Sequence, residues 1–111
     1  MEIDISGRHF QVTPPLKRYA VDKVGKLDKF ALKIESAHVV MGVERIRQIV
    51  EITVAGKNIR LTAKAVSPDM YAAFDTCFGK IQLQLSRLHD RVKDHKSRQI
   101  SKEARAEKRA S

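Results

Sequence analysis

Basic side chains at helical spacing are the residues of this sequence best suited to chemistry. Lys80, Gln84, Arg87 and Arg91 recur at steps of four, three and four, which places them along one side of a helix. Ammonium and guanidinium groups in such a row attract phosphate, and arginine adds bidentate hydrogen bonds. The row therefore predicts contact with a polyanion such as an RNA backbone.

A second group of basic residues lies near the N-terminus and is only partly offset by Asp22 and Asp28. It consists of Lys17, Arg18, Lys23, Lys26, Lys29 and Lys33. Such lysines can also simply keep a helix surface soluble. The charge of the whole chain favours polyanion binding, because 22 Lys+Arg outnumber 13 Asp+Glu and the net charge is +9.

Residues that usually carry catalysis or bind metal are scattered. The four histidines have no spacing typical of a zinc site, and no glycine-rich phosphate loop is present. Cys77 lies between Phe74 and Phe78 on an apolar helix stripe, where we expect it to pack as a small hydrophobic residue. We therefore expect no enzyme activity, no catalytic residue, no metal and no cofactor.

Two amphipathic helices are predicted to position the basic groups. The first has Thr13 as its N-cap and continues to about residue 31, with apolar residues at spacings of three and four and all on one face. The second has Ser67 as its N-cap and Pro68 in its first turn, and its apolar stripe runs from Met70 to Val92, about 25 residues in all. Both stripes need an apolar surface to cover them.

Four strands are predicted to provide that surface. Apolar and polar residues alternate around Ile3 and Ile5 up to Gly7, and β-rich runs follow at residues 37–43, 50–54 and 59–66, joined by turns at 44–48 and 56–58. We predict an α+β fold of order β-α-β-β-β-α, a four-stranded sheet with both helices on one face. The other face carries Arg60, Thr62 and Lys64, which suits exposure to solvent or a partner.

The 111 residues suit a single domain, and charge divides the chain into two parts. Residues 96–111 hold six basic and two acidic residues, so we expect a basic, flexible tail of charge +4 after a folded domain of charge +5 at residues 1–95. No signal peptide or membrane-spanning run is apparent, and one cysteine cannot form an internal disulfide. We expect a cytoplasmic protein that does not bind membranes.

Several motifs resemble the ribosome hibernation-promoting factor family, which includes ribosome-associated translation inhibitors and was once called sigma-54 modulation protein. They are Ile3-Asp4-Ile5-Ser6-Gly7-Arg8-His9, the helix entry at Thr13, Lys26-Leu27-Asp28-Lys29-Phe30, and Asp69-Met70-Tyr71-Ala72-Ala73-Phe74-Asp75 followed by Lys80 and Gln84-Leu85. The resemblance covers about residues 1–95 in the same order of elements. From the residues themselves, we expect Tyr71 to pack at the helix start and Asp75 to cap or pair locally.

The resemblance implies a fold like that of double-stranded RNA-binding domains and a place on the small ribosomal subunit near the decoding centre. Binding there blocks the messenger and tRNA sites and inhibits translation in stationary phase or stress. Short members promote pairing of ribosomes, often with a second dimerisation-promoting factor, and we expect this chain to be such a short member and a monomer off the ribosome. Its basic tail differs from the acidic extension of the inhibitor branch.

The predicted contacts with small-subunit ribosomal RNA combine the helix rows with the family pattern. They are Lys23, Lys26, Lys29, Lys80, Gln84, Arg87, Arg91 and Lys93. Leu83 and Ser86 stand where the family usually has basic residues, so Arg91, Lys93 or the tail would have to compensate. Because both helices cover one sheet face, we expect their basic residues to form one broad patch.

Two other functions fit parts of the sequence. A general binder of structured RNA, without preference for the ribosome, would use the same basic helices. A small enzyme such as an acylphosphatase is also a compact basic α/β protein, but its order β-α-β-β-α-β requires a closing strand after residue 67, where the sequence predicts a helix.

Overall fold

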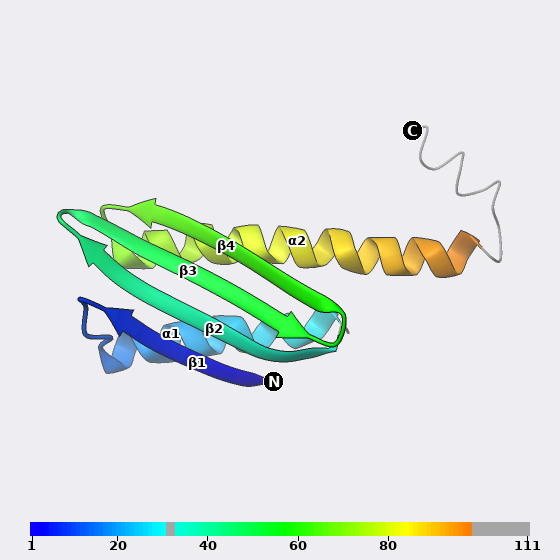
Figure 1. Ribbon diagram of the computed structural model, residues 1–111, viewed down its shortest axis with the longest axis horizontal. Helices are drawn as coiled ribbons and strands as arrows, with labels where there is room; N and C mark the ends of the chain where they lie inside the picture. The colour runs from blue at the N-terminus through cyan, green and yellow to red at the C-terminus, as the bar shows by residue number, and fades with distance from the viewer. Residues whose placement is uncertain (31–32, 99–111) are drawn as a thin grey trace.

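A computed structural model shows a four-stranded sheet with two helices on one face (Figure 1). The structure describes residues 1–30 and 33–98, and side chains as far as Arg91. The elements are β1 (Glu2–Arg8), α1 (Pro14–Gly25), the 3₁₀ helix η1 (Lys26–Phe30), β2 (Ile34–Glu44), β3 (Arg47–Gly56), β4 (Ile59–Ser67) and α2 (Met70–Arg98). The predicted α+β fold and its order β-α-β-β-β-α are confirmed, and the last described element is a helix.

The strands lie in the order β1-β2-β3-β4, with β1 parallel to β2 and the other pairs antiparallel. The hairpin turns are shorter than predicted, because Glu44 pairs with Arg47 and Gly56 pairs with Ile59. Each turn therefore has two residues, a common hairpin length. β1 also continues one residue past Gly7, to Arg8. At Gly7 the carbonyl of Phe10 approaches so closely that any side chain would collide with it.

The first predicted helix is in fact two segments. α1 begins as predicted, with the Thr13 hydroxyl accepting a hydrogen bond from the Leu16 amide at 3.4 Å. It ends at Gly25, a poor helix former, and η1 continues in the tighter 3₁₀ geometry to Phe30. The expected end of the single helix, residue 31, lies outside the described residues.

The second helix starts later than predicted, and Ser67 is not its N-cap. Ser67 belongs to β4 and pairs with Gln48, so its backbone is held in the sheet. The carboxylate of Asp69 takes the capping role and accepts a hydrogen bond from the Ala72 amide at 2.9 Å. α2 then continues to Arg98, past the predicted domain boundary at residue 95, and residues 99–111 of the predicted tail lie outside the described residues.

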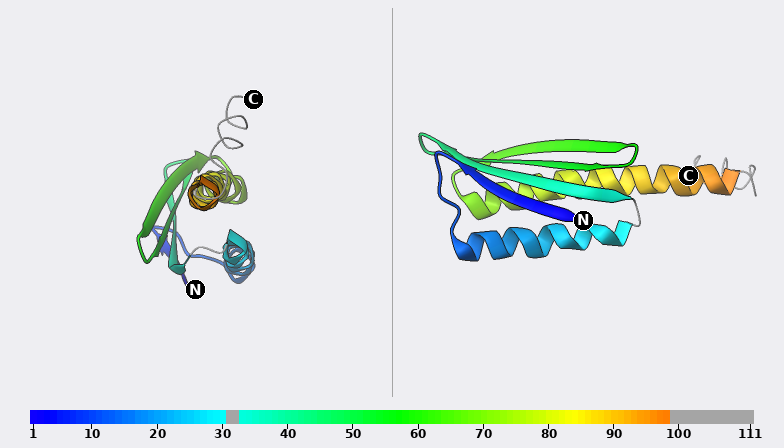
Figure 2. Two further views of the ribbon diagram at one scale, coloured as in Figure 1. Left: turned by 90° about the vertical axis from the view of Figure 1, so that its right-hand side faces the viewer. Right: turned by 60° about the horizontal axis from the view of Figure 1, so that its bottom comes forward.

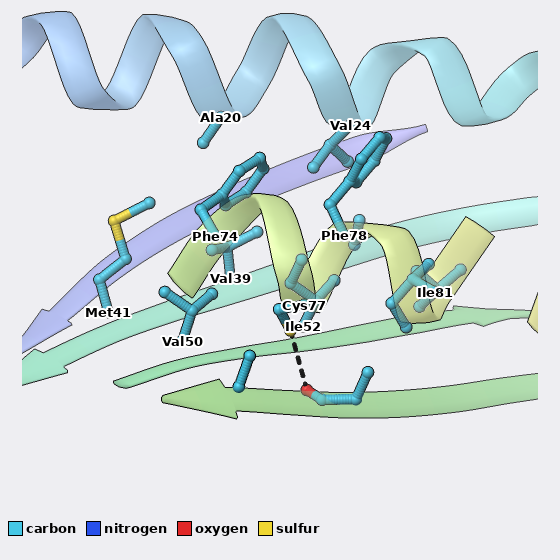
Figure 3. Close-up of a cluster of buried hydrophobic side chains, with 14 of the residues drawn as sticks. Ala20, Val24, Val39, Met41, Val50, Ile52, Phe74, Cys77, Phe78 and Ile81 are labelled. Carbon is cyan, nitrogen blue, oxygen red and sulfur yellow. Dashed lines mark hydrogen bonds between the residues drawn. The ribbon is translucent and has the colours of Figure 1, made fainter. Parts of the chain in front are cut away.

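The core lies between the sheet and the helices (Figure 3). The end-on view in Figure 2 shows both helices on the same side of the sheet. Phe74, Cys77 and Ile81 of α2 and Ala20 and Val24 of α1 are fully buried there. Residues Val39, Met41, Val50, Ile52 and Val54 of the central strands are fully buried beneath them. The predicted outward residues Arg60, Thr62 and Lys64 are exposed on the opposite face, as expected.

Candidate nucleic-acid interface

The predicted row on α2 lies along the free edge of β4. The Lys80 ammonium donates a hydrogen bond to the Lys64 carbonyl at 2.8 Å, and the Gln84 amide donates one to the Thr62 carbonyl at 3.3 Å. β4 has a neighbouring strand on one side only, so these side chains cover carbonyls of the sheet edge. Two of the predicted RNA contacts therefore also have a structural partner.

The rest of the α2 row points away from the protein. Arg87 and Arg91 are exposed, and Leu83, one of the departures from the family pattern, is 52 % exposed on the same helix. Ser86, the other departure, is half-buried. Lys93 lies in α2, but its side chain is outside the described ones. We call Lys80, Gln84, Arg87 and Arg91 the α2 row.

A second row runs from the end of α1 into η1. Its members Lys26 and Lys29 are exposed, and they lie one above the other because side chains three residues apart align in a 3₁₀ helix. The ammonium of Lys23 stands 5.5 Å from the centre of the Tyr19 ring, and that of Lys29 stands 5.5 Å from the centre of the Phe30 ring. We call Lys23, Lys26 and Lys29 the α1 row.

The two rows do not form the single broad patch that the sequence predicts. On one flank of α2, Asp75 contacts Tyr19 of α1 and His89 contacts Phe30 of η1. The α2 row is on the other flank, where Lys80 and Gln84 reach β4. The body of α2 therefore lies between the two rows.

Both rows are rich in charges that the protein does not neutralise internally. Among the side chains described, ion pairs within 4.0 Å join only histidines to aspartates, His38 to Asp4 and His89 to Asp90. No lysine or arginine in that set is paired with a carboxylate. Free cationic groups of this kind are available to phosphates and would release counterions on binding RNA.

Asp75 has a partner that the sequence did not predict. Instead of pairing locally, its carboxylate accepts a hydrogen bond of 2.6 Å from the hydroxyl of Tyr19, a residue of the other helix. This hydrogen bond is the main reason that the pKa of Tyr19 rises from 10.0 to about 12. Tyr71 packs at the start of α2 as expected, edge-on against Tyr19 with ring centres 5.0 Å apart. No short-range spacing predicts the Tyr19–Asp75 contact, because the two residues are 56 positions apart.

Cys77 packs in the core, as predicted. Its thiol is fully buried and donates a hydrogen bond to the Ala63 carbonyl at 3.2 Å, the dashed line in Figure 3. Burial raises the pKa of Cys77 to about 11. Among the described side chains, which end at Arg91, three or more His, Cys, Asp or Glu residues nowhere gather as a metal site would require. No helix within residues 1–30 and 33–98 is long and apolar enough to cross a membrane.

The outer face of the sheet differs from the helix side. It carries a hollow of about 410 Å³ near the β2–β3 hairpin, where Gly42 in the middle of the sheet has no side chain. Arg8 and Lys64 line the hollow, but Glu44 and Glu51 line it too. Because those carboxylates repel phosphate, the rows on the helices are the better candidate for RNA.

Comparison with known proteins identifies similar chains. A family model described as sigma 54 modulation protein / S30EA ribosomal protein matches residues 3–93. The chain is 37 % identical over 101 residues to the ribosome hibernation promoting factor of Pseudomonas putida, covering 91 % of this chain and 92 % of that one. It is 33 % identical over 103 residues to the factor of the same name from Azotobacter vinelandii, covering 93 % and 90 %.

Two solved structures have the same fold. A ribosomal subunit interface protein from Coxiella burnetii superposes with a TM-score of 0.74 at 25 % identity, covering 79 % of this chain and 97 % of that one. The N-terminal domain of Thermus thermophilus Protein Y superposes with a TM-score of 0.72 at 26 % identity, covering 79 % and 99 %.

Proposed function

The chain belongs to the sigma 54 modulation protein and S30EA ribosomal protein family, and on that premise we propose that it is a ribosome hibernation factor. It binds the ribosomal RNA of the small subunit near the decoding centre and blocks the messenger and tRNA sites. Translation is thereby inhibited in stationary phase or stress, and ribosomes are led to pair, with a second factor assisting. The proposal includes no catalytic step.

The exposed cations of the two rows that lack a carboxylate partner are the observation that carries this proposal. Arg87, Arg91, Lys26 and Lys29 are exposed, and none is paired with a carboxylate among the described side chains. Because the rows flank α2 on both sides, RNA strands on either side of this helix could be held together. This arrangement suits a folded RNA that presents phosphates on both sides of the helix.

The proposed interface can be tested by reversing charges that have no structural partner. The double variant Arg87→Glu with Arg91→Glu suits this better than a change at Lys80, whose ammonium also binds a β4 carbonyl. We expect co-sedimentation with small subunits to weaken at least about tenfold, and the salt dependence to fall by about 0.7–0.9 per lost phosphate contact. Sucrose gradients of whole ribosomes would report pairing in the same samples.

A matched control keeps the total charge change the same. Lys57→Glu with Arg60→Glu reverses two exposed charges near the β3–β4 hairpin, outside both rows, and should bind nearly as the unchanged protein does. Equal losses for both double variants would indicate general electrostatics instead of this site. Equal affinity of the unchanged protein for small subunits and for free duplex RNA would favour the general RNA binder.

A further inference from the structure

The contact between Tyr19 and Asp75 joins the two helices that carry the basic rows. The residues are 56 positions apart, and their oxygen atoms are separated by 2.6 Å. Among the described residues, this is the one side-chain hydrogen bond between α1 and α2. The helices otherwise pack against different strands, α1 along β1 and α2 along β3 and β4. The Tyr19–Asp75 hydrogen bond is therefore a direct link between two helices that each also pack on the sheet.

The ring of Tyr19 is held from several directions. It packs edge-on against Tyr71, with centres 5.0 Å apart, and against Phe74, with centres 5.7 Å apart. Phe74 is fully buried in the core, so one of the ring's neighbours is itself immobilised. With its hydroxyl bound to Asp75, the ring has little freedom to rotate away.

The same ring also lies beneath a member of the α1 row. Lys23 follows Tyr19 by one helical turn, and its ammonium stands 5.5 Å from the ring centre. A cation at this distance is attracted to the face of an aromatic ring and keeps its N–H donors for another partner. Asp75 thus acts on Lys23 through Tyr19.

We propose that Tyr19 and Asp75 are positioning residues that hold Lys23, a member of the α1 row, in the orientation that binds RNA. The inference rests on the proposed function, because it assigns a role in binding to a contact between helices. It also gives Asp75 of the Asp69–Asp75 motif a purpose, because its carboxylate accepts the hydrogen bond from the Tyr19 hydroxyl. Neither residue needs to touch the RNA.

Two tyrosine variants provide the test, because they remove the same atom at neighbouring places. Tyr19→Phe deletes the hydroxyl that binds Asp75, whereas Tyr71→Phe deletes a hydroxyl with no hydrogen-bond partner among the described residues. We expect Tyr19→Phe to weaken binding to small subunits about 3- to 10-fold, at a temperature where circular dichroism shows every variant folded. Tyr71→Phe should bind as the unchanged protein does.

A second comparison separates positioning from general stability. In a Lys23→Ala background, Tyr19→Phe should cost less than twofold, because the side chain that it positions is gone. In the Arg87→Glu, Arg91→Glu background it should keep its full effect. A merely structural hydrogen bond would lower the unfolding temperature and leave the affinity of the folded protein unchanged in every background.

Alkaline titration checks that the contact exists in solution. The neutral Tyr19 hydroxyl donates to Asp75, so the tyrosinate absorbance should include an upper step with a pKa near 12, which Tyr19→Phe removes. Asp75→Asn should bring the upper step down toward 10. If the titration shows the contact but Tyr19→Phe binds as well as the unchanged protein, the positioning role is wrong.

The outcomes also distinguish this inference from the function on which it rests. If the unchanged protein does not bind small subunits, the proposed function fails. If the unchanged protein binds, and Arg87→Glu with Arg91→Glu weakens binding while Tyr19→Phe does not, the function stands and only the positioning role is overturned.

Discussion

The α1 row and the α2 row present similar charges but are held in different ways. On α2, Lys80 and Gln84 donate hydrogen bonds to carbonyls at the edge of the sheet. On the α1 side, Lys23 and Lys29 stand over aromatic rings and make no such bond. A lysine over a ring keeps all three N–H donors, whereas Lys80 has already used one. The α1 row is thus the more available and the α2 row the more rigid.

The difference teaches that a row of basic residues can have two purposes at once. The open edge of β4 presents carbonyls that another chain could pair with, and lysine is a common means of protecting such an edge. Lys80 and Gln84 protect it here, while Arg87 and Arg91 farther along the same row remain free. The spacing of a charged row does not reveal which members have which purpose.

The largest expected effect comes from removing a core residue of α2 that also contacts α1. Phe74 is fully buried, contacts the Tyr19 ring and stacks on Phe78 with ring centres 5.8 Å apart. Phe74→Ala should lower the free energy of unfolding by about 3–5 kcal/mol, measured by urea denaturation. Val24→Ala, in the buried face of α1, should cost about 2 kcal/mol because fewer atoms are lost. Equal costs would mean that the two helices anchor equally in the core.

The separation of the rows predicts that their contributions to binding add. Lys26→Glu with Lys29→Glu should weaken binding to small subunits by roughly 1.5–3 kcal/mol, as should Arg87→Glu with Arg91→Glu, because each pair loses two phosphate contacts. The rows share no partner, so the quadruple variant that combines both pairs should lose the sum of the two binding free energies within about 0.5 kcal/mol. Affinities measured at one salt concentration provide the check. If the quadruple variant binds small subunits no more weakly than either double variant, the two rows contact the same strand.

Much of the fold was predictable because apolar periodicity reports which residues are buried. What local sequence could not indicate was where the first helix changes geometry. Val24, Leu27 and Phe30 are three residues apart, a spacing that fits a 3₁₀ helix as well as one face of an α-helix. The site was harder to predict from the sequence, because the flank of α2 on which a side chain lies depends on which strands the helix covers. The Tyr19–Asp75 contact depends on the same long-range packing.

The smallest expected effects concern the first turns of the helices that carry the rows. Asp69 caps α2 with a charged acceptor 2.9 Å from the Ala72 amide, whereas the Thr13 hydroxyl caps α1 at 3.4 Å from the Leu16 amide. A negative charge at a helix N-terminus is further stabilised by the helix dipole. Asp69→Ala should therefore cost about 1–1.5 kcal/mol of unfolding free energy and Thr13→Ala about 0.5–1 kcal/mol.

Ser67→Ala is the matched control for these caps. Its hydroxyl only accepts a bond from the Asp69 amide at 3.3 Å, so we expect a cost below about 0.5 kcal/mol by thermal denaturation. A cost for Ser67→Ala equal to that of Asp69→Ala would return the capping role to the serine that the sequence alone indicates. If the costs fall in the order Asp69→Ala, Thr13→Ala, Ser67→Ala, the N-terminus of α2 is capped more strongly than that of α1. This agrees with the hydrogen bonds that hold Lys80 and Gln84 of the α2 row against β4.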